Sequence, residues 1–301
     1  MRISLIHNPD AGEDDHAGDA LRSLVTEAGH ELTYLALAEP GWREALADPG
    51  DLVVVAGGDG SVGKVFKEIS TKRVPVTLLP VGSANNIART VGIADRDVEA
   101  LVAGWDDGEL RRFDLGRATA PWGEELFAES VGGGVFGEVL ARAPQAERAV
   151  GEVDGEEKVD LGLELLQEVI EGSPARPWRI EVDGDDLSGE FLAVELMNTR
   201  EIGPNLPLAP DSDAGDGLLE VALVGEAERP KLLEYLSERL RDLNLPPPEI
   251  TRRRGRRIVL EAPADVRLHV DDGLWPEDQG ARRSGEIVVE LGPALDLLVP
   301  S

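Results

Sequence analysis

The chain has 301 residues, of which 42% are hydrophobic, as expected of a folded protein with one or two domains and a sizeable core. Its 59 acidic and 30 basic residues give a net charge of −29, which would repel phosphate backbones and disfavours nucleic acid as a partner. The absence of cysteine excludes disulfides, thiolate metal sites and cysteine nucleophiles.

No feature of the sequence indicates a membrane-embedded or secreted protein. No apolar stretch approaches the roughly 20 residues that cross a bilayer, and the first apolar run is too short for a signal peptide. We therefore expect a cytoplasmic protein with only transient membrane contact, and a homodimer is left open. Because only five of the basic residues are lysine, we also hypothesise a surface adapted to high salt.

The first third of the chain alternates short apolar runs with amphipathic stretches. This pattern is typical of βαβ units on a parallel sheet. The predicted strands are Arg2–Ile6, Glu31–Leu35, Asp51–Ala56 and Val74–Leu79, and the predicted helices are Ala17–Ala28, Trp42–Ala47, Ser61–Ser70 and Ala84–Val91. The sequence thus predicts an α/β fold that begins with a doubly wound, Rossmann-like sheet.

After about Arg111 the pattern changes to alternating strands, interrupted by predicted helices over Glu157–Glu171 and Pro230–Leu243. We expect strands at Trp178–Val182, Phe191–Met197, Leu218–Val224 and Ile258–Leu260, and two more within Ile287–Val299. The prediction is a nucleotide-binding domain over 1–114 and a mostly antiparallel β-sandwich substrate domain over 115–291. Residues 292–301 are a candidate to complete the first domain.

The strongest chemical signal is the segment Gly57-Gly58-Asp59-Gly60-Ser61, which lies between a buried strand and a helix. Glycines let the backbone approach a ligand closely, and the helix start favours an anion such as phosphate. The segment matches neither the P-loop nor the dinucleotide fingerprint. A tight turn without a ligand is the alternative, but Asp59 favours a Mg²⁺ ligand or an orienting group beside the phosphate.

A second loop repeats this arrangement after the next predicted strand. Gly82 and Ser83 precede Asn85 and Asn86 at a helix start. Ser83 could be only a helix cap. Two such loops at the carboxyl ends of neighbouring strands are better explained by one shared ligand, and we favour a nucleotide.

These loops resemble the diacylglycerol kinase catalytic family, which includes bacterial lipid kinases and sphingosine kinases. The resemblance covers nearly the whole chain and rests on Asn8-Pro9, Gly57–Ser61 and Leu79–Arg89. Both loop hydroxyls are Ser where the family has Thr, and Asn86 replaces the family's usual Asp. The resemblance implies a kinase that transfers the γ-phosphoryl group of ATP to a lipid alcohol such as diacylglycerol.

The resemblance also implies site residues. ATP phosphates would lie against Asn8, Gly57, Gly58, Asp59, Gly60, Ser61, Gly82, Ser83 and Asn85, with Mg²⁺ bridging the phosphates and Asp59. The segment Asp213–Glu220 resembles a family stretch that binds a structural Mg²⁺, here through Asp216 with Asp213 and Leu218. The alternative is that Asp216-Gly217 is only a hairpin turn.

One position departs from the family. Leu274 stands where the family has the Glu that is the likely general base for the lipid hydroxyl, and a leucine cannot accept a proton. Asp271 or Asp272 could serve instead, or Glu277 could reach back. Otherwise the protein binds nucleotide without phosphorylating a lipid.

Three other functions therefore compete with a lipid kinase. An NAD kinase shares the Gly-Gly-Asp-Gly motif. A catalytically silent binding regulator would agree with Leu274 and Asn86. A dehydrogenase-like enzyme is disfavoured, because the dinucleotide fingerprint is absent. The basic patch Arg252–Arg254 could contact anionic headgroups, but we favour the exposed start of a strand. No histidine has metal-site spacing, and His269 is of interest only because it lies near Asp271.

Overall fold

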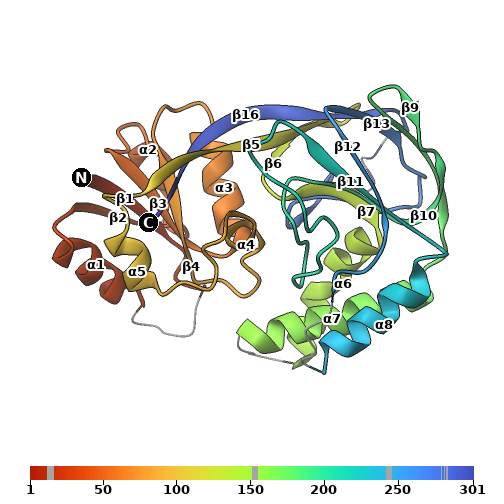
Figure 1. The fold of residues 1–301 in the computed structure, drawn as a ribbon, viewed down its shortest axis with the longest axis horizontal. Helices are drawn as coiled ribbons and strands as arrows, with labels where there is room; N and C mark the ends of the chain where they lie inside the picture. The colour runs from red at the N-terminus through yellow and green to blue at the C-terminus, as the bar shows by residue number, and fades with distance from the viewer. Residues whose placement is uncertain (12–16, 151–154, 242–245, 279, 281, 283) are drawn as a thin grey trace.

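The computed structural model describes residues 1–11, 17–150, 155–241, 246–278, 280, 282 and 284–301. The chain forms two halves joined by long strands (Figure 1). The strands of both halves belong to one hydrogen-bonded sheet network, parallel at its N-terminal end and antiparallel elsewhere. This confirms the predicted fold class.

The N-terminal half is a parallel sheet in the order β2-β1-β3-β4, with helices packed around it. Its elements are β1 Arg2–His7, α1 Ala17–Glu27, β2 Glu31–Ala36, α2 Trp42–Ala45, β3 Leu52–Gly57, α3 Asp59–Ile69, β4 Val76–Pro80, α4 Asn86–Val91 and α5 Val98–Ala103. The four strands and four helices expected here are confirmed within a few residues, and α5 is an additional helix.

Local sequence explains why this half folds as it does. Every residue of β3 is buried, as expected of a central parallel strand covered on both faces. In α3, Val62, Val65, Phe66 and Ile69 are buried at helical spacing, so this face packs on the sheet. The turn from β3 into α3 is thereby held at the carboxyl edge of the sheet.

The C-terminal half is mainly antiparallel. Its strands are β6 Gly123–Phe127, β7 Ser130–Gly134, β8 Arg176–Val182, β9 Asp185–Asp186, β10 Gly189–Met197, β11 Leu219–Gly225, β12 Thr251–Gly255, β13 Arg257–Glu261, β14 Leu268–Val270 and β15 Gly273–Leu274, and its helices are α6 Val135–Val150, α7 Gly155–Gly172 and α8 Arg229–Arg239. Alternate residues of β10 enter separate hydrophobic clusters, one between strands and one beneath the three helices. Figure 1 shows these helices together below the strands.

Two long strands run through both halves. β5, Glu109–Ala120, pairs antiparallel with β16, Ile287–Val299. The prediction of two strands at this end of the chain is wrong, because β16 is continuous and absorbs a bulge between Leu291 and Ala294. Its last part returns to the first half, where Leu297 pairs in parallel with Val76 of β4.

Helix α6 was not expected, since the two helices predicted after Arg111 correspond to α7 and α8; residues 242–243 of the second prediction lie outside the described residues. Gly134, with a φ of 90°, turns the chain from β7 directly into α6, and Pro144 lies inside the helix. A glycine run followed by a helix-interrupting proline hides the periodicity of the segment. Side chains of α6 line a cavity next to the glycine loops.

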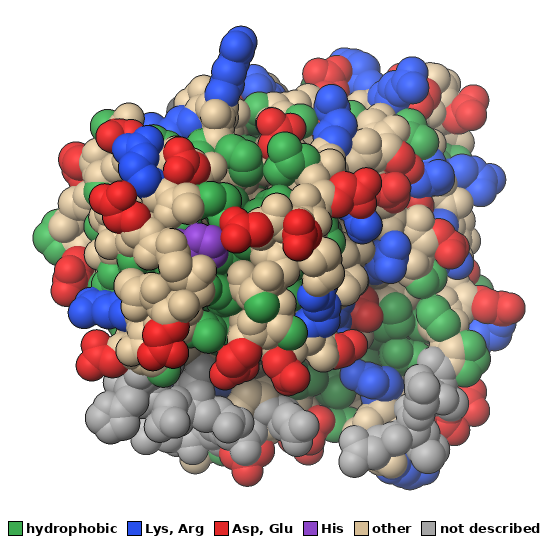
Figure 2. All heavy atoms as spheres, turned by 60° about the vertical axis from the view of Figure 1, so that its left-hand side comes forward, with side chains coloured by type: hydrophobic (Ala, Val, Ile, Leu, Met, Phe, Trp, Pro, Cys, Tyr) green, Lys and Arg blue, Asp and Glu red, His purple; other side chains and the backbone are tan. Residues whose placement is uncertain are grey.

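Acidic and basic side chains are interspersed on the face of the molecule drawn in Figure 2. In the part of the chain that the structure describes, no helix is long and apolar enough to cross a membrane.

Candidate nucleotide and acceptor site

The two glycine loops touch at the carboxyl ends of β3 and β4. Gly57 and Pro80 are in register on the two strands, which brings the loops that follow them together. A Cβ at Gly82 would collide with the backbone of Gly58. Glycine at 82 is therefore required by packing between the loops, whether or not a ligand is bound.

Asn85 shapes the second loop. Its side chain donates to the carbonyl oxygen of Gly82 at 2.6 Å and accepts the Gly82 N–H at 3.1 Å. Its φ of 55° lies in the left-handed region that Asn tolerates better than most residues. These contacts leave Ser83 exposed at the loop tip, facing outward to any ligand.

Asn8 and Ser61 form a hydrogen bond that supports the first loop. The Asn8 amide donates to the Ser61 hydroxyl at 3.1 Å, and the Asn8 side-chain oxygen accepts the N–H of Asp10 at 3.2 Å. Ser61 is buried within α3. Both predicted residues thus lie at the site, where they link the end of β1 to the start of α3.

Asp59 connects the two loops. Its carboxylate oxygens accept the backbone N–H groups of Asn86 and Ile87, each at 2.9 Å. Burial raises the pKa of Asp59, the two hydrogen bonds oppose that rise, and the nearby charge of Asp271 adds to it. Asp59 thus holds the start of α4 against α3, and its contact with Mg²⁺ or phosphate stays a prediction.

A polar cleft opens in front of the loops, with a volume of about 240 Å³. Lys64 and Lys158 line it, which places two of the chain's five lysines at one site in a strongly acidic protein. Its other lining residues are Asn8, Asp10, Ala11, Gly58, Asp59, Gly60, Ser61, Gly82, Ser83 and Asp272. Glycine backbone, a helix start and two lysines are together suited to phosphate groups.

A second cavity of about 260 Å³ adjoins the cleft. Its apolar wall comes from Phe136, Val139, Leu140, Leu166, Ile202 and Pro204. Its polar end contains Asn86, Glu129, Ser130, His269 and Asp271. The cleft and the cavity share Gly58, Asp59, Gly60, Ser83 and Asp272, so their occupants would meet at these residues.

The two predicted substitute bases have different surroundings. Asp271 accepts hydrogen bonds from Lys67 at 2.7 Å and from the backbone N–H groups of Ala128 and Glu129 at 3.0 and 2.9 Å. Asp272 is exposed and lies so close to Gly60 that a Cβ there would collide with its carboxylate. The Asp271 carboxylate therefore joins the two halves, whereas Asp272 lines both the cleft and the cavity.

The position of the family's glutamate does not face the site. Leu274 pairs with His269 across β14 and β15 and is half-buried, and Glu277 is exposed. Neither residue is among the described residues that line the cleft or the cavity. The reach of Glu277 back into the site stays a prediction without support from this geometry.

Glu129 is a site residue that the sequence did not reveal. It is buried, and Oε1 accepts a hydrogen bond from the Asn86 amide at 3.1 Å. Burial raises the pKa of Glu129 well above its ordinary value, and the charges of Asp59 and Asp271 raise it further. A carboxylate within the segment Phe127–Gly134, between buried residues, was the available signal.

His269 supports the turn that carries Asp271 and Asp272. His269 Nε2 lies 3.0 Å from both carboxylate oxygens of Glu195, and both residues are buried. Burial alone would lower the pKa of His269, but the Glu195 carboxylate outweighs it and raises the pKa. This pair, with the contact of Nδ1 to the Asp271 carbonyl at 3.1 Å, fixes the end of β14.

The predicted structural Mg²⁺ residues lie on the turn before β11, away from the cleft. Asp216 accepts the N–H of Leu218 at 3.0 Å and forms an ion pair with Arg254, which also pairs with Glu220 at 2.8 Å. Asp213 caps the same turn through the N–H of Gly215. The described residues include no cluster of three or more acidic or histidine side chains suited to a metal. The Asp216 carboxylate is thus paired with a guanidinium in this structure, and the binding of Mg²⁺ at this turn stays a prediction.

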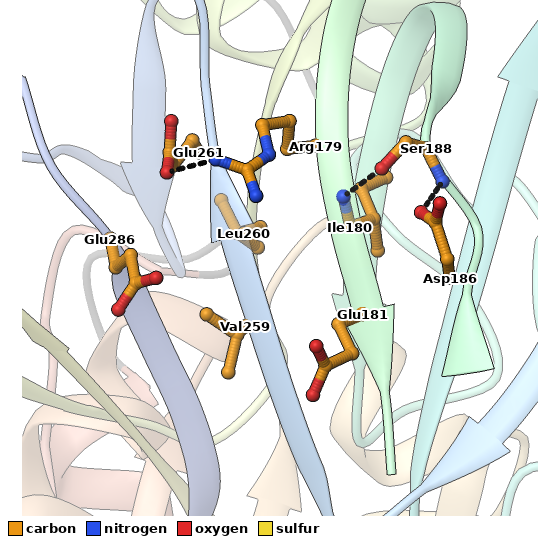
Figure 3. A pocket seen from close by; sticks show the side chains of 9 residues that line it. All are labelled: Arg179, Ile180, Glu181, Asp186, Ser188, Val259, Leu260, Glu261 and Glu286. Atoms are coloured by element: carbon orange, nitrogen blue, oxygen red, sulfur yellow. Dashed lines mark hydrogen bonds and ion pairs between the residues drawn. The ribbon is translucent and has the colours of Figure 1, made fainter. Parts of the chain in front are cut away.

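A further cavity, of about 250 Å³, lies in the C-terminal half and shares no residue with the glycine loops (Figure 3). Arg179 pairs with Glu261 at 3.0 Å, and Ser188 accepts the N–H of Ile180 at 3.1 Å. Asp186 accepts the N–H of Ser188 at 2.9 Å. Arg179 and Glu261 are thus engaged with each other, and Asp186 and Ser188 with the backbone.

Comparisons with known proteins agree with this geometry. The diacylglycerol kinase catalytic domain matches residues 2–118, and the YegS C-terminal NAD kinase beta sandwich-like domain matches residues 143–277. The chain is 25% identical to a diacylglycerol kinase of Bacillus subtilis over 300 residues, which are 95% of this chain and 93% of the relative. It is 30% identical over 232 residues to the Pseudomonas aeruginosa protein named "Probable lipid kinase YegS-like", covering 74% and 71% of the two chains.

A solved structure shows the same fold. The crystal structure of a diacylglycerol kinase from Bacillus anthracis superposes with a TM-score of 0.69 at 18% identity, over 99% of this chain and 96% of that one. Both halves and the strands that join them are thus common to the two proteins. Given the two domain matches and the relatives above, the chain belongs to the family of diacylglycerol kinases and YegS-like lipid kinases.

Proposed function

We propose that this protein transfers the γ-phosphoryl group of ATP to the hydroxyl of a lipid alcohol such as diacylglycerol. The observation that carries the proposal is the meeting of two cavities of different chemistry at Gly60, Ser83 and Asp272. One is polar and contains lysines, and the other is largely apolar. The names of the relatives agree with this assignment.

The polar cleft would hold the phosphates. Backbone N–H groups at the start of α3, together with Ser83, would hydrogen-bond phosphate oxygens, and Lys64 and Lys158 would neutralise their charge. Phosphoryl transfer depends mainly on positioning and charge stabilisation, which this cleft supplies. Asp59 would act by keeping the two loops in one arrangement.

Mg²⁺ would enter with the nucleotide. Such ions are usually bound by one or two carboxylates together with phosphate oxygens. Asp272 fits this requirement because its carboxylate is exposed beside Gly60 at the edge of the cleft. The ion would offset the negative charge of the phosphates.

The apolar cavity would take the acceptor. Its wall of side chains from α6, α7 and the loop before β11 suits acyl chains, while its polar end suits a hydroxyl. A lipid would reach it through brief contact with a membrane surface. We propose the cytoplasm as the compartment, since the reaction consumes ATP.

The test is phosphate transfer from ATP to a panel of lipid alcohols and to NAD, with MgATP binding followed in parallel. We expect transfer to a lipid alcohol, and Asp272→Asn should reduce it by about 10- to 1,000-fold if it helps to bind Mg²⁺. Transfer to NAD alone would assign a soluble-nucleotide kinase instead. MgATP binding without transfer to any acceptor would favour the silent regulator that Leu274 allows.

A further inference from the structure

Four carboxyl groups converge at the polar end of the apolar cavity. Asp59, Glu129, Asp271 and Asp272 all line it. Lys67 neutralises Asp271, and the backbone of α4 holds both oxygens of Asp59. Glu129 is thus distinguished by being buried and having a single amide partner, Asn86.

The Asn86–Glu129 contact is built into the fold. Asn86 also donates to the Gly203 carbonyl at 3.0 Å, and its oxygen accepts from Asn205 at 3.0 Å. These bonds fix which end of the Asn86 amide faces Glu129, so Glu129 must be the acceptor. An acidic group is therefore present at the start of α4, although residue 86 itself is neutral.

Glu129 also lies on the side of the site that faces the apolar cavity. It lines the acceptor cavity but not the polar cleft, whereas Asp272 lines both. A hydroxyl that enters along the apolar wall would meet Glu129 on the side away from the phosphates. This separation is what a proton acceptor needs, since the nucleophile must lie between its base and the phosphorus.

We propose that Glu129 is the general base of the reaction and takes the place of the glutamate that is absent at Leu274. The inference rests on the kinase function proposed above. The acceptor hydroxyl gives its proton to the Glu129 carboxylate as its oxygen forms the bond to the γ-phosphorus. The bond from that phosphorus to the β,γ-bridging oxygen breaks, and ADP leaves with the electron pair.

The groups around Glu129 change its pKa. The charged and titratable groups that face it are Asp59 of α3, Asp271 with its partner Lys67, Asp272, and His269 of β14. Burial raises the pKa of Glu129 well above its ordinary value, and the neighbouring acids raise it further. The rate of transfer should therefore rise with pH as Glu129 loses its proton.

The decisive variant is Glu129→Gln, compared with Asp272→Asn and with the exposed control Glu190→Gln. We expect Glu129→Gln to lower kcat by about 100- to 10,000-fold with unchanged MgATP affinity, and to remove the acid limb of the pH profile. Asp272→Asn should weaken MgATP binding and keep that limb. Glu190→Gln should match the wild type.

Two results would overturn the inference. One is a kcat for Glu129→Gln within about threefold of the wild type, and the other is an acid limb that persists in this variant. If Glu129→Gln does not fold, Glu129→Asp decides, because moving the carboxylate should shift the midpoint of the limb. An unshifted midpoint would count against Glu129. Absence of transfer by the wild type would instead remove the proposed function, and this inference with it.

Discussion

Asp59 shows how one side chain can support a site through the backbone that it holds in place. Both of its oxygens accept backbone N–H groups from α4, so its removal would free the second loop. We expect Asp59→Asn to lower the free energy of unfolding by about 1–3 kcal/mol, because an amide can accept only one of these bonds and leaves a buried donor unpaired. Urea denaturation measures this, and an unchanged midpoint would contradict it.

The raised pKa of Glu129 leads to a prediction of how the stability of the protein depends on pH. A carboxyl whose pKa is raised in the folded state favours folding below its unfolded pKa, and this contribution is lost as pH rises through the folded pKa. Glu129→Gln should therefore become progressively more stable than the wild type as pH increases from about 4.5, by about 1.4 kcal/mol per unit of pKa shift. Thermal unfolding of both proteins across this range tests the sign. A difference that shrinks with pH would be contrary to it.

At the scale of elements, we expect the contact between the two glycine loops to be the feature most sensitive to substitution. Gly82→Ala would place a methyl group against the Gly58 backbone, which cannot move without disturbing β3 or α3. We expect a loss of about 1–3 kcal/mol in stability and much weaker binding of MgATP, measured by calorimetry.

The matched control for Gly82→Ala is Gly172→Ala at the end of α7. A Cβ at Gly172 would have open space around it, so stability and MgATP affinity should stay near the wild-type values. Equal effects of the two substitutions would show that the contact between the loops is not the reason why residue 82 must be glycine.

The element scale also shows what sequence could and could not predict. β3, α3 and both glycine loops were predicted because their signals are local: a buried run, helical spacing and a turn between them. The partners of Asp271 could not be predicted, since Lys67 and Ala128 lie far away along the chain. Long-range pairs of this kind depend on the tertiary fold, which periodicity does not report.

The same reason explains the position of Glu129. Nothing near it in sequence indicates that Asn86 of α4 will be its hydrogen-bond partner. The family resemblance directed attention to Asp271, Asp272 and Glu277, because they are close to Leu274 along the chain. In space, the carboxylate that we propose as the base belongs to Glu129, directly before β7.

At the scale of the whole molecule, the net charge of −29 makes stability depend on salt. Raising KCl from 0.1 to 1 M shortens the screening length from about 10 to about 3 Å and weakens repulsion among surface carboxylates. We expect the melting temperature to rise over this range. A constant or falling temperature in a fluorimetric melt would contradict the hypothesis of a surface adapted to salt.

The path of β16 has a consequence for how the protein is made. On the ribosome, residues 76–80 of β4 emerge long before Leu297, their partner from the other end of the chain. Until synthesis reaches that strand, one edge of the N-terminal sheet is open to other chains. The N-terminal half therefore cannot finish folding as a nascent fragment, and its completion awaits the last strand of the chain.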